Sequence, residues 1–381
     1  MTDGPTSDAA RATAPARPRV SVIVPTYKEA ANLPLLIDRV ARLREASGLE
    51  IELLIMDDDS RDGSVELVRA RPEPWVELVV RTTDRGLSAA VLDGLRRARG
   101  DVLIGMDADL SHPPEVIPDM LQKLDAGADF VVGSRYVKGG TTSDDWGVFR
   151  WLNSRVATLL ARPLTALRDP MSGFFALRRA TFEAGRAFNP IGYKIALEMI
   201  VKCGCERVVE VPIHFEDRRL GESKLTLKQQ LLYLLHLRRL YIFKFGVWSQ
   251  LAQFLFVGAL GTVVNLVALT ALLALGLAAR PAVASAIFLS MVSNFVLNRR
   301  FSFSDARRGT SWPRQLLTFI AAASLGAIVN YGTALFLLKQ IASLPPQLAA
   351  LGGIAVGTGL NFVASRYLVF RSTHVRPPRA P

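Results

Sequence analysis

Cysteine, histidine and aromatic side chains are scarce in this chain of 381 residues, which has 2 Cys and 4 His and is 8% aromatic. Cys203 and Cys205 form a C-x-C pair between an apolar helix pattern and a strand pattern. Two thiols are too few for a four-ligand zinc site, and we interpret them as a reduced, cytosolic pair. No apolar run follows the charges of residues 1–19, so this segment is predicted to be a disordered tail and not a signal peptide.

Acidic residues are also in the minority, because 34 Asp and Glu face 46 Lys and Arg, for a formal charge of +12. Such a balance suits nucleic acid, but no base-reading motif or aromatic-basic pattern accompanies it. Anionic lipid headgroups and phosphorylated substrates are the better partners for this charge. We therefore expect a membrane and a phosphorylated ligand among the partners, and no nucleic acid.

Residues 20–225 alternate between strand and helix patterns, which predicts a mostly parallel, doubly wound α/β sheet. The predicted strands are Val20–Val24, Ile51–Met56, Trp75–Val80, Val102–Met106 and Phe130–Val132. The predicted helices are Asn32–Glu45, Ser88–Arg99 and Pro114–Asp125. Such sheets bind ligands at the carboxyl ends of their strands. Polar clusters occupy that edge at residues 25–29, 57–60 and 107–109.

Asp107-Ala108-Asp109 is the most informative of these clusters, because two carboxylates follow a buried strand with one residue between them. Carboxylate oxygens are hard ligands that suit Mg²⁺ or Mn²⁺, which also take water and phosphate oxygens. Alone the triplet is weak, since Asp often begins turns. With the other two clusters on the same edge, it predicts a metal site at Asp107 and Asp109 that faces a diphosphate.

From about Ser249 the composition becomes that of a membrane protein. Four apolar stretches, at about 251–276, 282–298, 315–338 and 347–370, approach or exceed the roughly 20 residues that cross a bilayer. The loops on one side hold only Arg280 and Lys339, whereas basic residues collect on the other side. The positive-inside rule then places both termini and residues 20–225 in the cytoplasm, and the chain in the cytoplasmic membrane.

The membrane stretches repeat one another. Residues 256–265 resemble residues 320–330, and residues 294–303 resemble residues 361–370, which indicates a duplicated two-helix hairpin. Small residues in both copies favour close helix packing. Four asparagines recur in the repeats and either form hydrogen bonds between helices or line a polar cavity: Asn265, Asn294, Asn330 and Asn361.

Residues 226–248 mix Leu and Tyr with basic side chains, as helices that lie on a membrane surface do. An amphipathic helix of the protein core is the alternative. The adjoining membrane stretches favour the interfacial reading.

Together with further motifs along the chain, the three clusters resemble those of the family 2 glycosyltransferases of GT-A fold. The resemblance is strongest to the dolichyl/polyprenyl-phosphate mannose synthases. It covers about residues 20–245, and the four apolar stretches resemble the GtrA-like membrane domain. The resemblance implies a GT-A domain at 20–225, interfacial helices at 226–248, a membrane domain at 249–372 and a tail at 373–381. The motifs that carry it, beyond the three clusters, are residues 133–136, 169–174, 192–194 and 218–225.

The resemblance also implies roles for individual residues. Asp107 and Asp109 would hold the metal and the diphosphate, and the loop Gly221–Lys224 would close near the donor. Asp59 reaches the nucleotide pocket or caps a helix, and Ser111 departs from relatives that carry Gln. The residues assigned to the nucleotide sugar are Pro25, Tyr27, Glu29, Asp57, Asp59, Asp107, Ala108, Asp109, Arg135, Arg218 and Lys224. Those assigned to the acceptor phosphate are Arg135, Arg150, Ser154, Ser172 and Lys224, with Arg218 a further candidate. Those assigned to catalysis are Asp107, Asp109, Arg135, Arg218 and Lys224.

The predicted reaction is transfer of mannose from GDP-mannose to a polyprenyl phosphate, with inversion and with Mg²⁺ or Mn²⁺. A lipid monophosphate is already an anionic nucleophile at neutral pH, because its second pKa is about 6. No general base is then needed, and neither His112 nor His214 is assigned a catalytic role. One alternative is UDP-glucose as the donor. The other is a lipid-linked sugar translocator with a degenerate soluble domain, against which the intact Asp107 and Asp109 argue.

Overall fold

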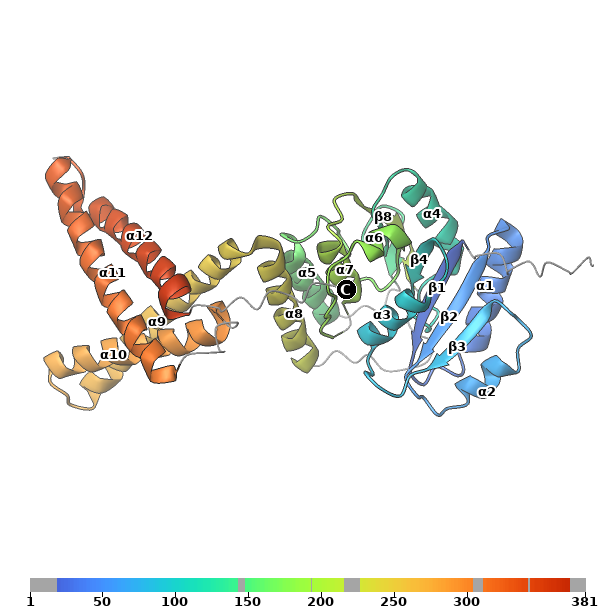
Figure 1. Cartoon of the computed structure of the whole chain (residues 1–381), viewed down its shortest axis with the longest axis horizontal. Helices are drawn as coiled ribbons and strands as arrows, with labels where there is room; N and C mark the ends of the chain where they lie inside the picture. The colour runs from blue at the N-terminus through green and yellow to red at the C-terminus, as the bar shows by residue number, and fades with distance from the viewer. Residues whose placement is uncertain are drawn as a thin grey trace, which may run out of the picture. The chain divides into compact units, whose positions relative to one another are not determined.

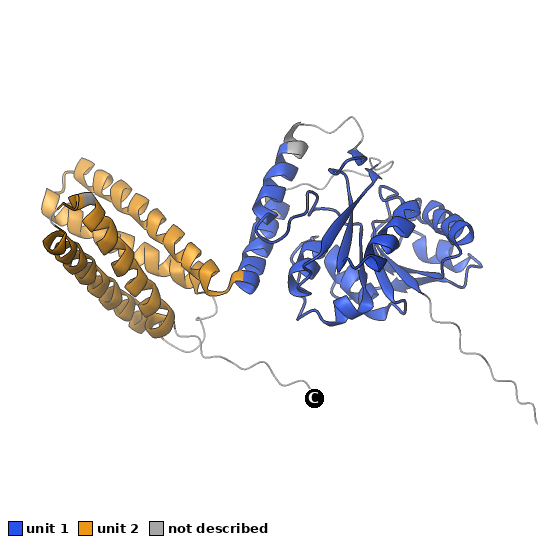
Figure 2. Cartoon of the chain, turned by 90° about the horizontal axis from the view of Figure 1, so that it is seen from above, with its two compact units in different colours: residues 1–244 blue, residues 245–381 orange. Residues whose placement is uncertain are grey.

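The structure, a computed structural model, describes residues 19–142, 148–192, 194–215, 227–303, 311–341 and 343–370. It divides into two compact units, residues 1–244 and 245–381, which Figures 1 and 2 show by element and by unit. The first unit is a mixed α/β domain and the second is helical.

The first unit alternates strands and helices along most of its length. Its first half contains β1 (Val20–Thr26), α1 (Leu33–Ser47), β2 (Ile51–Asp57), α2 (Ser64–Arg69), β3 (Val76–Val80), α3 (Leu87–Arg97) and β4 (Val102–Gly105). Next come a 3₁₀ turn (Pro114–Val116), α4 (Ile117–Asp125), β5 (Phe130–Ser134), β6 (Thr141–Thr142) and α5 (Val148–Ala161). The unit ends with β7 (Phe175–Arg178), α6 (Arg179–Glu183), α7 (Ile195–Lys202), β8 (Val208–Pro212), β9 (His214–Phe215) and α8 (Leu227–Phe245).

Seven strands form one sheet in the order β3-β2-β1-β4-β7-β5-β8. Neighbouring strands are parallel except at β7, which is antiparallel to β4 and β5. The predicted fold class, a mostly parallel α/β sheet, is confirmed. Strand β1 continues past Pro25 to Thr26. Strands β7 and β8 of this sheet, and the short strands β6 and β9, were not among the predicted strands.

The reversed direction of β7 matters for the site. Because β7 runs antiparallel to β4 and β5 and begins where they end, the segment just before it lies at the carboxyl edge of the sheet. Gly105 at the end of β4 is paired with Phe175 at the start of β7. Residues 172–174 are therefore placed beside the Asp107–Asp109 loop, although they are far from it in sequence.

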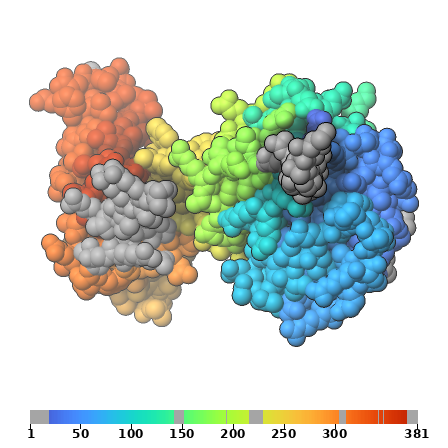
Figure 3. Space-filling model, turned by 45° about the vertical axis from the view of Figure 1, so that its right-hand side comes forward, coloured from blue at the N-terminus to red at the C-terminus, as the bar shows by residue number. Residues whose placement is uncertain are grey.

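Helices cover both faces of the sheet, and alternate residues of each strand face opposite layers. On β1, Val22 and Val24 belong to the apolar cluster that includes α1 and α4. Ile23 belongs to the cluster that includes α3 and α7. Both sets of strand residues are buried, so β1 and β2 are mostly apolar on both faces. Ser21 and Glu52 are polar exceptions, and their side chains are hydrogen-bonded to each other. The segments coloured blue to green in the space-filling view pack into one body (Figure 3).

The second unit contains α9 (Val247–Ala274), α10 (Ala279–Leu297), α11 (Trp312–Gln340) and α12 (Pro346–Ala364). Short π-helical turns at Asn298–Ser302 and Ser365–Val369 extend α10 and α12. Among the described residues, four helices are long and apolar enough to cross a membrane: Val247–Ala274, Ala279–Ser302, Trp312–Gln340 and Leu348–Val369. The four predicted spans are thereby confirmed as helices.

The duplicated hairpin is visible in how these helices pack. Helix α9 pairs with α10, and α11 pairs with α12 (Figure 1). In the first pair the Asn294 side chain covers Gly261, where an added Cβ would lie 2.1 Å from the amide oxygen. In the second pair Asn361 covers Gly326 in the same way, at 2.0 Å. No larger residue than glycine fits either place, so both repeats use one packing contact.

A cluster of phenylalanines also follows the repeat. Phe295 and Phe303 of the first copy correspond to Phe362 and Phe370 of the second. The rings of Phe303 and Phe370 stack with centroids 4.9 Å apart, and those of Phe295 and Phe370 lie 5.8 Å apart. This cluster joins the two hairpins in one apolar core.

Candidate active site

Backbone strain is concentrated at the carboxyl edge of the first unit. In the described part of the chain, five residues other than glycine have positive φ angles, between 48° and 64°: Lys28, Asp59, Arg61, Asp84 and Leu110. They lie in the loops after β1, β2, β3 and β4. Such conformations cost on the order of 1–3 kcal/mol each and tend to occur at functional sites. The four loops are thus held in specific shapes by the surrounding structure.

Hydrogen bonds join the loop after β1 to the loop after β2. The backbone amide of Lys28 donates to Ser60 Oγ at 2.9 Å, and that of Ala30 donates to Asp62 Oδ2 at 3.1 Å. Asp62 also accepts bonds from the backbone amide and hydroxyl of Ser64. Burial would raise the pKa of Asp62, but these hydrogen bonds outweigh burial and hold its pKa below the usual value. Its ionised carboxylate therefore fixes the spacing of the two loops.

Asp57, predicted to contact the nucleotide, is completely buried at the end of β2. Its carboxylate accepts bonds from the Thr26 hydroxyl at 3.1 Å and the Ser60 amide at 2.9 Å, and from the Ser60 hydroxyl. These bonds tie together the ends of β1 and β2. The nucleotide contact of Asp57 stays a prediction.

The neighbouring carboxylates have cationic partners. Asp58 forms a buried ion pair with Arg81 and accepts a bond from the Gly86 amide at 2.7 Å, which holds the start of α3. Asp59 pairs with Arg61 and Arg85, and the hydrogen bond from Arg61 is the main cause that lowers its pKa. The other predicted nucleotide contacts of this loop pair lie at the same edge: Pro25, half-exposed Tyr27, and Glu29, which accepts a bond from Asn32.

Asp107 and Asp109 lie in the loop after β4, with Ala108 buried between them. The Asp107 backbone amide donates to His112 Nδ1 at 3.0 Å, and the His112 ring stacks on Phe174 with centroids 5.3 Å apart. Asp109 is buried, and its Oδ1 accepts bonds from the amide and the hydroxyl of Ser111. His112 and Ser111 therefore set the shape of this loop, a role that the sequence did not reveal.

The surroundings of Asp107 fit a bound cation. A Cβ on Gly173 would lie 3.2 Å from both Asp107 carboxylate oxygens, so only glycine leaves this space open. The Asp107 side chain is 30% exposed, whereas Asp109 is buried. In the described ranges, no group of three or more His, Cys, Asp or Glu side chains is arranged to hold a metal. Two carboxylates suffice for Mg²⁺ or Mn²⁺ when water and substrate phosphate oxygens supply the other ligands.

Arg135, predicted to be catalytic, follows β5 and forms a two-pronged ion pair with Asp169. Its Nε and Nη2 lie 2.7 and 2.8 Å from the two carboxylate oxygens, and its backbone amide donates to the same carboxylate. Asp169 is fully buried, and Glu210 accepts a bond from its amide at 2.9 Å. The guanidinium also lies over the Phe215 ring, 5.1 Å from its centroid. Asp169 thus fixes the orientation of Arg135 at the sheet edge.

Lys194 joins this group, and the sequence analysis gave it no role. It caps the N-terminus of α7, and its Nζ donates to the Met171 carbonyl at 2.9 Å. Burial is the main cause that lowers its pKa to about 7, the charge of Arg135 lowers it further, and Asp169 and Asp107 oppose both effects. Asp169 and Lys194 lie in motifs that the sequence already displays. A lysine at the start of an apolar helix was the signal that it would be buried near charges.

The residues predicted for the acceptor phosphate are only partly visible. The Ser154 hydroxyl on α5 lies 3.0 Å from the Tyr136 hydroxyl, so it adjoins the Arg135 segment. Ser172 is buried before β7, where its hydroxyl accepts a bond from the Phe174 amide at 3.2 Å. Arg150 belongs to α5, but its side chain lies outside the described part. Arg218 and Lys224 lie outside the described residues, and their roles stay predictions.

Helices α5 and α8 together present an exposed apolar surface, which we call the leucine face. The hydroxyls of Tyr233 and Tyr241 on α8 donate to the carbonyls of Ala157 and Leu160 on α5, at 2.8 and 2.7 Å. Both helices expose large apolar side chains: Leu152, Val156, Leu159, Leu160, Leu231, Leu234, Leu235 and Phe243. An apolar surface of this kind on a domain attached to membrane helices fits a lipid interface.

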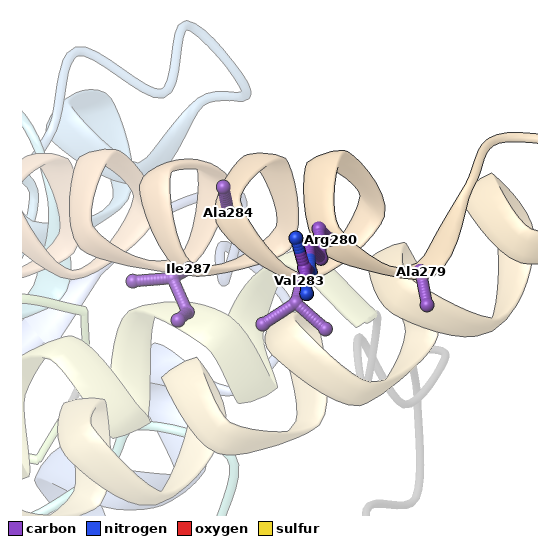
Figure 4. Close-up of a pocket in the computed structure, with 5 residues that line it drawn as sticks. All are labelled: Ala279, Arg280, Val283, Ala284 and Ile287. Carbon is purple, nitrogen blue, oxygen red and sulfur yellow. The ribbon is translucent and has the colours of Figure 1, made fainter.

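A shallow hollow of about 430 Å³ lies on α10 in the second unit (Figure 4). All of its lining residues come from that helix: Ala279, Arg280, Val283, Ala284 and Ile287. Arg280 is the one charged side chain in this lining, and no carboxylate accompanies it. The hollow therefore has none of the ligands that the predicted metal chemistry needs.

Comparison with protein families identifies both units. Residues 21–186 match the model of glycosyl transferase family 2. Residues 253–370 match the GtrA/DPMS transmembrane domain. The first match contains the loops after β1, β2 and β4, together with Arg135 and Asp169. The second contains both copies of the hairpin, so the chain is a membrane protein.

Curated relatives agree with this assignment. The dolichol-phosphate mannosyltransferase of Pyrococcus furiosus is 40% identical over 357 residues, which are 92% of this chain and 99% of that protein. The proteins of the same name from Mycosarcoma maydis and Saccharomyces cerevisiae are 46% and 44% identical over 60% and 59% of this chain, and over 81% and 88% of their own lengths. The chain therefore belongs to glycosyl transferase family 2, as a glycosyltransferase of the group that joins this domain to a GtrA/DPMS transmembrane domain.

Proposed function

We propose that this protein transfers mannose from GDP-mannose to a polyprenyl or dolichyl phosphate, with inversion at the anomeric carbon. The observation that carries the proposal is the grouping of Asp107 and Asp109 with two basic side chains, Arg135 and Lys194, at one edge of the sheet. An anion-binding site of this kind suits a reaction between two phosphorylated substrates. The names of the relatives supply the lipid and the sugar.

The acceptor phosphate is the nucleophile in this proposal. One of its oxygens forms a bond to the anomeric carbon, while the bond from that carbon to the diphosphate breaks and the diphosphate keeps the electron pair. Attack from the opposite face gives inversion. The phosphate is ionised at neutral pH, because its second pKa is about 6, so no residue has to remove a proton from it.

The chain's own cations hold the two anionic substrates near each other. Arg135 is oriented by Asp169, and Lys194 is held by the Met171 carbonyl, so both enter the reaction with their directions set. Asp107 and Asp109 would hold Mg²⁺ or Mn²⁺. The chemistry that such a cation supplies when bound is neutralisation of the leaving diphosphate. Arg218, Lys224 and Arg150 remain further candidates for the acceptor phosphate.

The leucine face would bring the site to its lipid substrate. Its side chains lie on α5 and α8, and α5 also carries Ser154, which adjoins the Arg135 segment through Tyr136. Lys244 near the end of α8 donates to the Leu164 carbonyl at 2.8 Å and keeps the last turn of the helix on the domain. By the positive-inside rule, we infer that this unit and both termini face the cytoplasm.

The test uses the purified full-length protein in detergent with dolichyl phosphate and radiolabelled donors. We expect GDP-mannose to label the lipid and UDP-glucose to leave it unlabelled. EDTA should stop the reaction, and added Mg²⁺ or Mn²⁺ should restore it. Labelling of the lipid by UDP-glucose and not by GDP-mannose would show that UDP-glucose is the donor. The absence of transfer from both donors, with product lipid moved across vesicle membranes, would instead support a translocator.

A further inference from the structure

Glu198 in the middle of α7 is a fully buried carboxylate that the proposed reaction does not use. It lies 2.6 Å from Lys202 Nζ and accepts a bond from the Asn189 backbone amide at 2.5 Å. Burial would raise the pKa of Glu198, but its contacts with His236, Lys202 and the Asn189 amide outweigh burial and hold its pKa below the usual value. A buried ionised carboxylate needs such partners, because an unpaired charge is costly in the protein interior.

His236 supplies the partner from outside α7. It lies on α8 and is 1% exposed, and its Nε2 is 3.0 Å from Glu198 Oε2. This is a close polar contact, and neither atom has a hydrogen-bond partner elsewhere in the described residues. The other ring nitrogen, Nδ1, is buried and has no hydrogen-bond partner among the described residues. In that part of the chain, Glu198 is therefore the polar anchor of His236.

The two ends of this contact belong to different functional parts. Helix α8 carries part of the leucine face on one side, while His236, Leu237 and Leu240 are buried on the other. Helix α7 begins directly after Lys194, whose amine lies among the charges of Arg135, Asp169 and Asp107. Glu198 is four residues after Lys194, one helical turn away.

The loop before α7 is held by the same carboxylate. Glu198 binds the amide of Asn189, and the carbonyl of Gly192 accepts a bond from the Ser88 hydroxyl at 2.8 Å. Ser88 lies at the start of α3, whose first turn follows the loop held by Asp58. A change at Glu198 thus affects both the loop and the helix start that place Lys194.

We propose that His236 is a positioning residue, which couples the lipid-facing helix α8 to the active site through Glu198 and α7 and so holds Lys194 in its catalytic place. This inference rests on the proposed function, because it assigns Lys194 to substrate phosphate. Helix α7 is short and buried from Ile195 to Val201, so we expect a shift of Glu198 to be passed along the helix to its N-cap residue, Lys194.

The coupling is tested by a double-mutant cycle in the full-length protein, with lipid mannosylation at saturating substrates as the readout. We expect His236→Gln to lower kcat about 3- to 30-fold, the range of mutations that act through a coupled element. Lys194→Met should lower it about 100-fold, as does the loss of one group that stabilises charge. If His236 acts through Lys194, the double variant loses no more than Lys194→Met alone. A merely structural contact would make the two losses multiply.

Tyr241→Phe is the matched control on the same helix. It removes a hydrogen bond from α8 to α5 but leaves Glu198 and α7 untouched, so any loss should multiply with that of Lys194→Met. Thermal unfolding shows whether each variant is folded, and Glu198→Gln replaces His236→Gln if the latter does not fold. Multiplying losses, a wild-type rate for His236→Gln, or loss of the fold in both variants would overturn the coupling. Failure of the wild type to mannosylate lipid would contradict the proposed function instead.

Discussion

The catalytic unit (residues 1–244) and the membrane unit (245–381) both bury polar side chains. The first gives each of them different partners, whereas the second repeats one contact. At the edge of the catalytic sheet each buried acid has its own partners: Asp57 has Ser60, Asp58 has Arg81, and Asp169 has Arg135. In the membrane unit one contact, an asparagine over a glycine, occurs twice. A reaction needs different chemical groups at defined places, whereas two pairs of membrane helices can pack through the same contact.

Irregular backbone also differs between the two units. All five positive φ angles at residues other than glycine, in the described ranges, belong to the catalytic edge. The membrane helices depart from regular geometry at two π-helical turns, which occupy equivalent places in the two hairpins. In the catalytic unit the irregular backbone therefore occurs in individual loops, whereas in the membrane unit it occurs at the same position of each hairpin.

The largest effect is expected at the carboxylates of the loop after β4. Asp107→Asn and Asp109→Asn should each lower lipid mannosylation about a thousandfold, because each removes a charge that would hold the cation against the leaving diphosphate. Thermal unfolding should stay close to that of the wild type for Asp107→Asn, whose side chain is partly exposed. Asp119→Asn, an exposed carboxylate in the first turn of α4, is the control. Equal rates for Asp107→Asn and the control would remove the metal site from this loop.

The ion pair of Arg135 and Asp169 should give the next effect. Breaking a buried pair costs about 3–5 kcal/mol in stability, so Arg135→Ala should lower the unfolding temperature as well as the rate. Arg135→Lys keeps the charge but loses the two-pronged contact, and we expect about a 30- to 100-fold lower kcat with a smaller loss of stability. Arg178→Lys changes an exposed pair with Asp125 and should alter neither measurement. A full rate for Arg135→Lys would show that charge alone matters here.

The membrane unit offers a test of the repeated contact. Gly261→Ala and Gly326→Ala should each destabilise their hairpin by about 1–3 kcal/mol, because the new methyl group collides with Asn294 or Asn361. Gly258→Ala and Gly332→Ala are matched controls, since an added Cβ there meets no atom within 4 Å. Thermal unfolding in detergent measures the effect, and calorimetric titration of GDP-mannose should show unchanged donor affinity. A different response from the two repeats would weaken the duplication as an explanation of the packing.

Much of the fold was predictable, because its signals are local. Apolar runs marked β1, β2 and β4, and long apolar stretches marked the four membrane helices. Strands β7 and β8 of the sheet were missed, and the residues of β7, Phe175–Arg178, are too few for a clear period. Its antiparallel insertion between β4 and β5 depends on contacts far apart in sequence, which no local pattern displays. Gly173 reaches Asp107 only through that insertion.

The candidate site was predictable where chemistry and position coincide in the sequence. Asp107 and Asp109 follow a strand and carry an obvious ligand type. Lys194 and Asp169 were visible only as members of motifs, because their roles depend on Arg135, which lies far from both in the sequence. The same limit applies to His236, whose partner Glu198 lies on another helix. Pairing between distant elements decides which buried charges belong to the site.

The smallest effect is expected at Asp62, which joins the first two loops but is not assigned to substrate. Asp62→Asn keeps one acceptor oxygen in place of two, so one of the bonds from Ala30 and Ser64 is weakened. One such bond contributes about 1 kcal/mol, and we expect about fivefold weaker GDP-mannose binding with little change in kcat.

The pKa of Asp62 is lowered in the folded protein, so its contribution is present above the unfolded value of about 3.9 and is lost as pH falls through the lower folded value. The ratio of wild-type to variant affinity should therefore stay constant between about pH 8 and about pH 5 in calorimetric titrations, because this range lies above the pKa of Asp62 in both the folded and the unfolded protein. A ratio that changes across this range would mean that Asp62 is not held ionised by these bonds, and that the two loops are joined by other contacts.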